Sequence, residues 1–579
     1  MRRISLSFLL LLVCYWLPAS PVGAERARSV AKTFLGIRPA GNHNRALSMK
    51  TQGADTEAPA YYVFNLEGGG FVIVSGDDAV TPILAYSRTG YFETEDMLEN
   101  LASWMKGLET SILETRASGT PPSEKTLKQW KKLESGWYAP SATGEKVLET
   151  ALWNQNEPYN RNCPVIYGQK APTGCVATAG AIIMRYHQYP ERGVGTLEGY
   201  DYSIMINGTD RSFHVDGHDL GHTYDWKNMP LTYKSGAYTQ VQAKQVAQLM
   251  WDIGVMSHMG YGFGASSASI IELAQGMVRY MGYDASACYI QKDSYTDNEW
   301  INLLVNEIDN GRPILYSGYH SLGSGHAFVC DGYDKDGLLH FNWGGGGNSN
   351  GFFTLEDMNN WTLANEAYIY LEPNHGGRAR IKNCGIMLTK TNSLNLVDGG
   401  MGPGTVLQAV VYSYCYTYFQ GFISIGKYNK DGLLLQVISE SKELLTDIGL
   451  SVLSASCQIT IPSVFSPGEY MAPCYSVDGI TWFPPDEMAA SFPLGYIDRI
   501  NPNDITSMLK DTSLSYSRSK RQIQVSAPVP ISYYYKNPSG DLSELYREQQ
   551  TIIIDDFLSG TYTIRIFYPG LSYILYINL

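Results

Sequence analysis

The chain has 579 residues, which is too long for one hydrophobic core and suggests about three to five domains. Apolar residues make up 44% and charged residues 17%, a composition typical of a folded globular protein and not of a disordered one. The net charge of −13, without a dense run of Lys or Arg, argues against nucleic acid as a partner.

The first 24 residues have the pattern of a secretory signal peptide. Met1-Arg2-Arg3 is basic, residues 4–17 are apolar, and Val22-Gly23-Ala24 offers the small residues that signal peptidase needs. The apolar run is too short to span a bilayer, and no later stretch is long and apolar enough to do so. We therefore expect a mature protein that is secreted, either extracellular or at the cell surface, without a transmembrane helix.

Residues 25–115 are predicted to form a compact α+β unit. Two β-rich runs flank Glu67-Gly68-Gly69-Gly70, which is the pattern of a β-hairpin. Apolar residues with helical spacing precede and follow the strands. The expected elements are a helix over 27–35, strands over 61–65, 71–75 and 83–87, and a helix over 98–113.

Residues 116–146 form a polar stretch that carries Pro121-Pro122 and Lys131-Lys132. We expect an exposed connection here, and exposed connections are where proteases cut. The stretch is therefore the expected processing linker to a second region, residues 147–373.

Residues 147–373 mix helix and strand patterns with Gly-rich clusters. Early in this region, Gln155 lies twenty residues before Cys175. If its side-chain N–H group reaches the start of the next helix, it can join the backbone N–H of Cys175 as an oxyanion hole. A surface glutamine without a role fits the same pattern.

The segment that follows Gly174-Cys175 is small or apolar with the spacing of a helix. A helix that begins at Cys175 places the sulfur at the positive end of the helix dipole, which lowers the pKa of a thiol and favours the nucleophilic thiolate. Gly174 would leave room for substrate beside the sulfur. Taken alone, the pattern also fits a small buried cysteine.

His214, His218 and His222 recur at four-residue intervals, which would suit a metal site on a helix. Gly217 and Gly221 interrupt any such helix. A polar loop is therefore expected, with no metal.

His326 follows a flexible Gly-Ser-Gly turn and leads an apolar strand pattern up to Tyr333. Residues 338–343 return as the partner strand, so the imidazole should face the strand end near Asn342 and Trp343. A bulge would change which of these two shares the face of the histidine. An imidazole placed here can deprotonate a thiol once a polar group fixes its tautomer, although a structural histidine also fits.

From about residue 374 onward, alternating runs recur between Gly, Pro and Asp turns, as in β-sandwich modules. We expect one or two modules, residues 374–498 and 499–579. The stretch 558–566 weakly resembles the C-terminal sorting domains of some exported bacterial proteins, and an ordinary terminal hairpin fits it as well.

Eight cysteines follow the signal-peptide pattern, and their pairing cannot be read from one sequence. The chain has no CxxC pair, so a structural zinc site is not expected. The eight are Cys163, Cys175, Cys288, Cys330, Cys384, Cys415, Cys457 and Cys474.

The order of these motifs resembles papain-like peptidases, and in detail the streptopain family of secreted bacterial cysteine peptidases. The similarity covers residues 147–370, and residues 25–115 are similar to the inhibitory propeptide of that family. The matching stretches are Asn154-Gln155 with Pro158-Tyr159-Asn160, Thr173–Tyr189, Tyr224–Pro230, Met259–Gly262, Gly325–Gly332, and Asn342-Trp343-Gly344 with Gly351-Phe352-Phe353.

The resemblance implies an α+β fold, in which a papain-like domain follows an α+β propeptide and precedes the β-sandwich modules. It implies a zymogen that hydrolyses peptide bonds of protein or peptide substrates through a thioester. The propeptide would be an intramolecular inhibitor, and no metal or organic cofactor is implied.

Position by position, the resemblance gives roles to seven residues. Cys175 would be the nucleophile, and His326 the general base and acid. Gln155 would be the oxyanion donor. The others are Asn342 and Trp343, which would orient and shield the histidine, and Ser267 and Gly325, which would line the substrate cleft.

The sequence departs from the family after Trp343. Family members commonly read Asn-Trp-Gly-Trp, whereas Gly344 is followed here by Gly345-Gly346-Gly347. Loss of a second indole opens the rim on the leaving-group side, which bears on subsite preference more than on the chemistry.

Two other functions fit part of the pattern. The same thioester could end on an amine, as in a transpeptidase or a transglutaminase-like enzyme, and cleavage assays with and without amine acceptors separate the two. An adhesion or carbohydrate-binding protein with an inactive papain-like domain would explain the large β-rich C-terminal third. The presence of every expected catalytic residue type counts against that reading.

Overall fold

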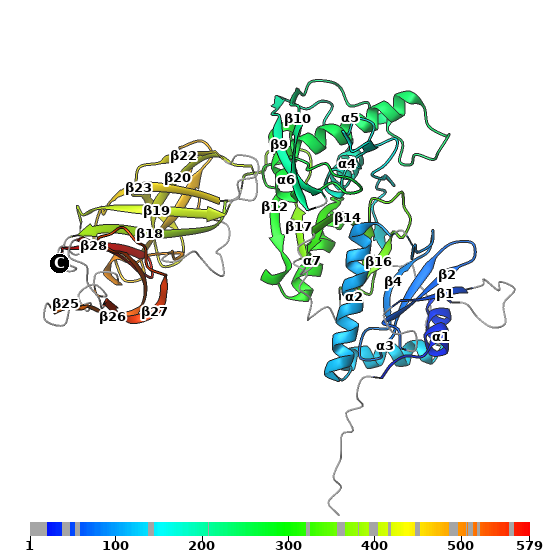
Figure 1. The fold of residues 1–579 in the computed structure, drawn as a ribbon, viewed down its shortest axis with the longest axis horizontal. Coiled ribbons are helices and arrows are strands. Elements are labelled where there is room, and N and C mark those ends of the chain that lie inside the picture. The colour runs from blue at the N-terminus through cyan, green and yellow to red at the C-terminus, as the bar shows by residue number, and fades with distance from the viewer. Residues whose placement is uncertain are drawn as a thin grey trace, which may run out of the picture. The chain divides into compact units, whose positions relative to one another are not determined.

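The computed structural model describes most of the chain, in two compact units (Figure 1). One unit comprises residues 1–273 and 290–371, and the other comprises residues 274–289 and 372–579. Most of the expected signal peptide, with Cys14, and Cys415 lie outside the described residues. The residues that the structure describes are 20–36, 47–52, 58–95, 97–136, 144–206, 208–319, 325–355, 365–379, 381–392, 403–414, 418–445, 452–485, 496–504, 507, 513–517, 522–554 and 561–578.

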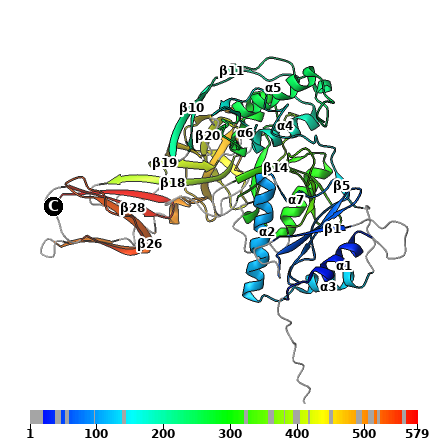
Figure 2. The ribbon, with the colours of Figure 1, turned by 45° about the vertical axis from the view of Figure 1, so that its right-hand side comes forward.

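The N-terminal part of the first unit has the α+β organisation expected from the sequence. The glycine-rich turn joins β2 and β3 as an antiparallel hairpin, in which Val63 lies opposite Ile73. Helices α1 and α3 lie together on these strands (Figures 1 and 2). The elements are α1 (Ala24–Phe34), β1 (Leu47–Gln52), β2 (Tyr61–Leu66), β3 (Phe71–Ser75), β4 (Ile83–Ser87), α2 (Glu99–Ser118) and α3 (Glu124–Glu134).

Helix α3 lies within the stretch that was expected to be an exposed connection. Its buried residues Thr126, Trp130 and Leu133 recur at helical spacing, and the last two join the apolar core formed with α1 and strands β2–β4. Ser123 caps the helix, because its Oγ accepts a hydrogen bond from the N–H of Thr126 (3.0 Å). This part of the linker is therefore ordered and packed.

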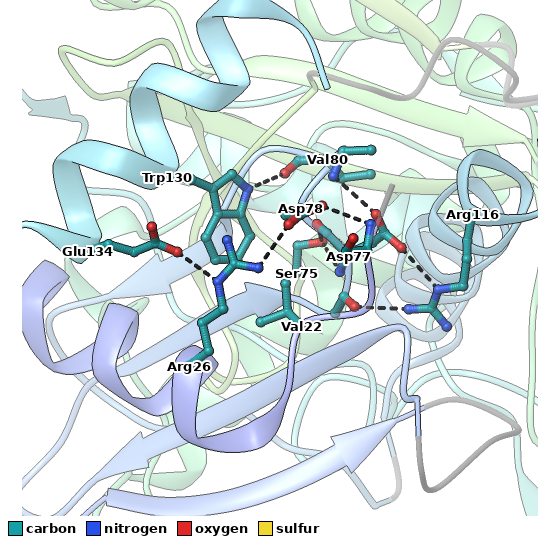
Figure 3. A network of polar contacts seen from close by, with 12 residues as sticks. Val22, Arg26, Ser75, Asp77, Asp78, Val80, Arg116, Trp130 and Glu134 are labelled. Carbon is teal, nitrogen blue, oxygen red and sulfur yellow. Dashed lines mark hydrogen bonds and ion pairs between the residues drawn. The ribbon is translucent and has the colours of Figure 1, made fainter. Parts of the chain in front are cut away.

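A polar network fixes α3 to the N-terminal part (Figure 3). Arg26 pairs with both Asp78 (2.9 Å) and Glu134 (2.7 Å), and its guanidinium lies 4.8 Å from the centre of the Trp130 ring. The indole Nε1 of Trp130 donates to the carbonyl of Val80 (2.9 Å). These contacts join α1, α3 and the loop after β3 into one body.

The region in which catalytic motifs were predicted follows, in residues 144–371. All of these residues except 274–289 belong to the first unit. Helix α4 packs against α5 and against β14. The helices are α4 (Cys175–His187), α5 (Gln240–Met256), α6 (Ile270–Met281) and α7 (Asp297–Asp309), with 3-10 turns at Trp226–Asn228 and Lys292–Ser294. The strands are β5 (Lys146–Val147), β6 (Val165–Ile166), β7 (Gln169–Lys170), β8 (Thr196–Leu197), β9 (Tyr200–Ile206), β10 (Thr209–Val215), β11 (His218–Asp219), β12 (Cys288–Gln291), β13 (Ile314–Tyr319), β14 (Gly325–Tyr333), β15 (Leu339–Asn342), β16 (Gly351–Phe353) and β17 (Asn365–Ile369).

One antiparallel sheet runs through both parts of this unit, in the order β1-β2-β3-β4-β16-β15-β14-β13-β17. The junction is short: Tyr86 lies opposite Phe352, and Ala85 lies opposite Phe353. The rings of Tyr86 and Phe352 stack at 4.9 Å, and the hydroxyl of Tyr86 donates to Asp334 (2.9 Å). The strands of the N-terminal part thus extend the sheet that carries His326.

The second unit is all β in its described C-terminal part, as expected. Its larger sheet has the order β23-β19-β18-β29-β28-β26-β25, with β27 beside β26, and a second sheet joins β21-β20-β22 with β24 beside β20. The strands are β18 (Lys382–Asn392), β19 (Val406–Tyr414), β20 (Gln420–Tyr428), β21 (Leu434–Val437), β22 (Lys442–Leu445), β23 (Val452–Thr460), β24 (Tyr470–Ser476), β25 (Ser513–Ser517), β26 (Gln522–Lys536), β27 (Tyr546–Ile554), β28 (Thr561–Tyr568) and β29 (Leu571–Asn578).

The larger sheet continues across residue 498, where the sequence analysis divided two modules. Strand β29 pairs in parallel with β18, so that Leu571 lies opposite Leu388. One apolar cluster contains Ile386 and Ile425 from before that point and Ile564 and Ile566 from after it. The last strands of the chain therefore share a sheet and a core with the strands that precede residue 498.

Candidate active site

The helix expected at Cys175 is confirmed: α4 begins at this residue, and Gly174 precedes it as the N-cap with φ +87°. A Cβ atom on Gly174 would lie 2.7 Å from the sulfur of Met259 and 2.9 Å from the carbonyl oxygen of Ser266. Both the backbone angle and this packing require glycine. The side of Gly174 on which a Cβ would lie is therefore occupied by Met259 and the backbone of Ser266.

The predicted meeting of Cys175 with the strand of His326 is present. The backbone N–H of Ala327, which directly follows His326 on β14, donates to Sγ of Cys175 (3.5 Å). The thiol and the histidine therefore lie at neighbouring positions on α4 and β14. Among the described residues, no hydrogen bond joins Sγ to the imidazole itself.

Burial sets the protonation of both groups in this form. It raises the pKa of the Cys175 thiol, and the backbone N–H groups of Ala327 and Val176 oppose the shift without cancelling it. Burial also lowers the pKa of His326. Both groups are thus held toward their neutral forms, so the lowered thiol pKa that the helix dipole alone predicts is wrong for this form of the chain.

The start of α2 lies over this pair, and sequence reasoning did not identify it. The carboxylate of Glu99 further raises the pKa of the Cys175 thiol. The buried side chain of Asn100 donates from Nδ2 to the carbonyls of Trp343 (2.8 Å) and Ala327 (3.3 Å). Helix α2 lies beside β14 in both views of the fold (Figures 1 and 2).

Aromatic packing anchors α2 one turn further along. Trp104 is 2% exposed, and its ring lies 5.1 Å from Phe341 and 5.9 Å from both Phe328 and Trp343. These three partners belong to β14, β15 and the residue after β15. The N-terminal part therefore holds the strand of His326 by an aromatic cluster as well as by hydrogen bonds.

Gln155 lies beside the approach to α4. Its carbonyl accepts a hydrogen bond from the N–H of Thr173 (3.0 Å), two residues before Cys175. The structure thus brings the backbone of Gln155 close to the segment that leads into Cys175, as the oxyanion role requires.

Asn342 and Trp343 separate onto two sides of the sheet. Asn342 lies opposite Val329, and a bulge follows between Cys330 and Gly332. Because side chains alternate along a strand, Asn342 shares a face with Val329 and not with His326. Its Nδ2 donates to Thr150 Oγ1 (3.0 Å) and to the carbonyl of Ala151 (3.0 Å).

Trp343 is the one of the two that packs on the face of His326. Its ring lies 4.6 Å from that of Phe328, which is two residues beyond His326 on β14. It is 1% exposed. Of the two residues that the sequence left open, Trp343 and not Asn342 therefore lies on the face of His326.

The two predicted cleft residues flank the pair on different elements. Ser267 is exposed, and its backbone exchanges hydrogen bonds with Gly260 (2.9 and 3.1 Å). The neighbouring Ser266 donates to the carbonyl of Pro172 (2.8 Å), which ties this loop to the start of α4. Gly325 opens β14 directly before His326.

Comparisons with known proteins match both parts of this unit. The peptidase C10 family matches residues 153–353, and the Spi protease inhibitor family matches residues 19–112. Streptopain of Streptococcus pyogenes is 34% identical over 325 residues, which are 53% of this chain and 76% of that protein.

The chain belongs to the streptopain family.

A second relative is the thiol protease/hemagglutinin PrtT of Porphyromonas gingivalis, which is 34% identical over 377 residues. The match covers 63% of this chain and 42% of PrtT, so the chain spans less than half of that relative. A solved fragment of prointerpain A from Prevotella intermedia is 29% identical, covering 56% of this chain and 99% of the fragment, with a TM-score of 0.44.

As a member of the streptopain family, the chain is a cysteine-type peptidase that carries its inhibitor-like pro-segment on the same polypeptide. The inhibitor match covers α1, β1–β4 and most of α2, whose first turn lies at Cys175 and His326. No helix in the described ranges is long and apolar enough to cross a membrane.

Two of the three histidines spaced at four residues form a different cluster in this streptopain-family chain, whereas His214 bonds Asp201 (2.7 Å). Nε2 of His218 and Nε2 of His222 each bond one carboxylate oxygen of Asp252 (2.8 and 2.7 Å), and Tyr224 donates to the same group (2.8 Å). Asp252 is 0% exposed, on α5. The loop expected here is wrong at two of the three positions, because His214 lies on β10 and His218 on β11. The buried carboxylate of Asp252, which sequence reasoning did not identify, joins His218 and His222 to α5.

All seven cysteines in the described part of the chain are free thiols, including Cys175. Six of them are buried. Burial raises the pKa of Cys163 to about 12, which keeps that thiol protonated and unreactive.

Proposed function

We propose that this chain is the precursor of a secreted cysteine endopeptidase, in which Cys175 is the nucleophile and His326 the general base and acid. The observation that carries the proposal is the hydrogen bond from Ala327 N–H to Sγ of Cys175 at the N-terminus of α4, directly beside His326.

The chemistry follows from these positions. Once the thiol proton has passed to His326, the sulfur attacks the carbonyl carbon of a peptide bond. The resulting oxyanion is stabilised by the N–H of Cys175 and by the side-chain amide of Gln155. His326 then gives its proton to the leaving amine, and a water molecule deprotonated by His326 hydrolyses the thioester to release the acid and restore the thiol.

Asn342 and Trp343 support the histidine in this proposal. Trp343 packs against Phe328 on the face of His326 and shields the imidazole from water. The amide of Asn342 bonds to Thr150 and Ala151 on the other face of the sheet, so it would orient the histidine indirectly, by fixing the end of β15 beside the histidine strand. Ser267 and Gly325 would line the substrate cleft on either side.

The pro-segment keeps the pair neutral and covered. Glu99 opposes thiolate formation, and Asn100 bonds to the backbone on both sides of the histidine strand. Processing within residues 116–146 would make the pro-segment a separate chain, and its departure would end this state. Because α3 is packed on α1 through Arg26 and Trp130, a cut beyond Glu134 would leave α3 attached to the pro-segment.

Export and substrate class complete the proposal. The signal-peptide pattern of residues 1–24 supports secretion, and the match to streptopain supports protein or peptide substrates. The pro-segment is the intramolecular partner.

The decisive experiment compares the purified precursor with its Cys175→Ala variant. We expect the wild-type chain to shorten by the length of the pro-segment and to gain caseinolytic activity, while the variant stays full length and loses activity by about four orders of magnitude or more. If both chains mature and degrade casein equally, Cys175 is not the nucleophile.

A further inference from the structure

A buried carboxylate in the histidine strand has no part in the mechanism described above. Asp331 is 2% exposed and follows His326 by five positions on β14. It lies between Cys330 and Gly332, where the pairing with β15 shifts, so it is the extra residue of the bulge in this strand. A bulge re-aims a side chain, and a buried charge requires partners, so the contacts of this carboxylate indicate its role.

The carboxylate of Asp331 accepts hydrogen bonds through both of its oxygens. Its Oδ1 lies 2.5 Å from Nδ1 of His340 on β15, and its Oδ2 accepts from the hydroxyl of Thr150 (2.5 Å). A carboxylate cannot donate, so Nδ1 of His340 carries a proton and the hydroxyl hydrogen of Thr150 points at Asp331. The carboxylate therefore fixes the direction of both hydrogen bonds.

That direction also determines how the amide of Asn342 is turned. Because the hydroxyl hydrogen of Thr150 is used on Asp331, its oxygen accepts from Nδ2 of Asn342 (3.0 Å). The same Nδ2 donates to the carbonyl of Ala151 (3.0 Å). The amide oxygen of Asn342 is thereby turned the other way, where it accepts from the backbone N–H of Gly344 (3.2 Å). A series of hydrogen bonds thus begins at the bulge and ends at the backbone just beyond β15.

This series joins three parts of the molecule that the proposed reaction needs. Asp331 lies on the strand of His326. Thr150 lies five residues before Gln155, the proposed oxyanion donor. The amide at the end of β15 directly precedes Trp343, which packs on the face of the histidine. The general base, the oxyanion donor and the shielding indole therefore share one support.

Burial makes this support sensitive to the loss of any member. The residues are 7% exposed at Thr150, 2% at Asp331 and 1% at Asn342. A buried donor or acceptor that loses its partner pays the cost of desolvation without compensation, so the remaining groups rearrange. A displacement of about 1 Å at reacting groups can cost about 10²-fold in rate, even when the substitution lies away from the chemistry.

We propose that Asp331 is a positioning residue for the peptidase reaction and that it acts through Thr150 and Asn342. It touches neither the substrate nor the reacting atoms. It holds the strand of the general base, the segment of the oxyanion donor and the shielding indole in fixed relative positions, and His340 holds the second oxygen of its carboxylate. The inference rests on the proposed function of the chain as a cysteine endopeptidase.

The first test is Asp331→Asn, which keeps the shape of the side chain but leaves one acceptor oxygen for two donors. The variant precursor is matured by immobilised wild-type enzyme, so that slow self-processing does not limit the measurement. We expect kcat for a quenched peptide to fall by about 10- to 100-fold while KM stays within about threefold of wild type. Alkylation of mature Cys175 by iodoacetamide should also slow, because it depends on the imidazole beside the thiol and requires no substrate.

Asp252→Asn is the matched control. Asp252 is also buried and also binds histidines, but its hydrogen-bond partners among the described residues, which include His218 and His222, lie outside the proposed site. This variant should unfold at a lower temperature and keep the wild-type kcat while it is folded. If the two Asp→Asn variants lose kcat alike, the loss is a general consequence of disturbing a buried carboxylate, and the positioning role is overturned.

A pair of substitutions at Thr150 tests the transmission directly. Thr150→Val removes the hydroxyl at nearly constant volume, whereas Thr150→Ser keeps it. We expect kcat to fall by about tenfold or more in Thr150→Val and to stay within about threefold of wild type in Thr150→Ser. Equal kcat in both variants would overturn the proposal. This pair also decides the matter if thermal unfolding shows that Asp331→Asn does not fold.

Failure of the inference and failure of the proposed function give different results. If wild type cleaves the peptide and both Asp331→Asn and Thr150→Val keep its kcat, the positioning role is wrong and the endopeptidase stands. If the wild-type protein cleaves neither the peptide nor casein although iodoacetamide alkylates Cys175, the proposed function fails and the positioning role fails with it.

Discussion

Replacing Trp104 by alanine in the precursor should release the pro-segment. The indole is 2% exposed and contacts the aromatic rings of Phe328, Phe341 and Trp343, none of which belongs to the pro-segment. The energy lost in Trp104→Ala therefore falls on the docking of α2. Truncation of a buried Trp costs about 3–5 kcal/mol, and since 1.4 kcal/mol is a factor of ten, the open fraction of the precursor should rise by about 10²- to 10³·⁵-fold.

The assay is the half-time of maturation of dilute precursor, followed by gel electrophoresis. The variant should mature faster up to the point at which opening no longer limits the rate. Lys106→Ala is the matched control, because this residue is exposed on the same helix. Thermal unfolding of both substitutions in the Cys175→Ala background separates weakened docking from a failure to fold.

The design has an internal check. Position 104 leaves with the pro-segment, so the mature enzymes derived from wild type and Trp104→Ala have the same sequence and should have the same kcat/KM. If the folded variant precursor matures no faster than wild type and Lys106→Ala, then the aromatic cluster does not hold the pro-segment and the reasoning is refuted.

Three other outcomes follow from the same contacts. Burial and, to a smaller extent, the charge of Glu99 raise the pKa of Cys175, so alkylation of the precursor by iodoacetamide should increase with pH with a midpoint above 9. Glu99→Gln should lower that midpoint. An unchanged midpoint would contradict this role for Glu99. Trp130→Ala should destabilise the Cys175→Ala precursor to urea by about 3–5 kcal/mol, whereas Leu127→Ala, at 37% exposure on the same helix, should change it by less than about 1 kcal/mol. The hydrogen bond to Asp252 raises the pKa of His222, so the stability that His222 contributes is complete below its unfolded pKa of about 6.5 and is lost as pH rises through its folded pKa. Burial alone would raise the pKa of Asp252, but hydrogen bonds from His218 and His222 lower it overall. The stability that Asp252 contributes is therefore lost only as pH falls through this lowered pKa. The stability difference between wild type and Asp252→Asn should therefore be larger at pH 6 than at pH 9, and an equal difference at both would argue against the charged pair.

The sequence predicted those parts of the site that local patterns determine. The Gly-rich turn located the hairpin of β2 and β3, and the small residues after Gly174 located α4 with Cys175 at its first position. The strand of His326 and its returning partner were also predicted. Each of these rests on spacing within a few residues, which one sequence contains.

Register and protonation required the fold. The bulge between Cys330 and Gly332 determines that Asn342 faces away from His326, and no pattern in the two strands indicates it. The raised pKa of Cys175 comes mainly from burial, which the helix start alone does not reveal.

Helix α3 was missed because its lysines dominate the composition of the linker. The spacing of Thr126, Trp130 and Leu133 was nevertheless a helical signal. Asn100 offered another signal, since it lies one turn before Trp104 on the buried, mostly apolar face of α2. A polar residue at such a position often has a specific acceptor, which here is the backbone around the histidine.

The shared sheet makes cleavage of the linker distinct from loss of inhibition. Hydrolysis of one peptide bond beyond α3 breaks neither the ladder of β4 on β16 nor the contacts of Tyr86 and Trp104. After this cut, the pro-segment would be a separate chain that stays bound through its strand pairing and its aromatic contacts. Full activity would then depend on dilution or on digestion of the detached piece, and activation should lag behind cutting by a delay that lengthens with protein concentration.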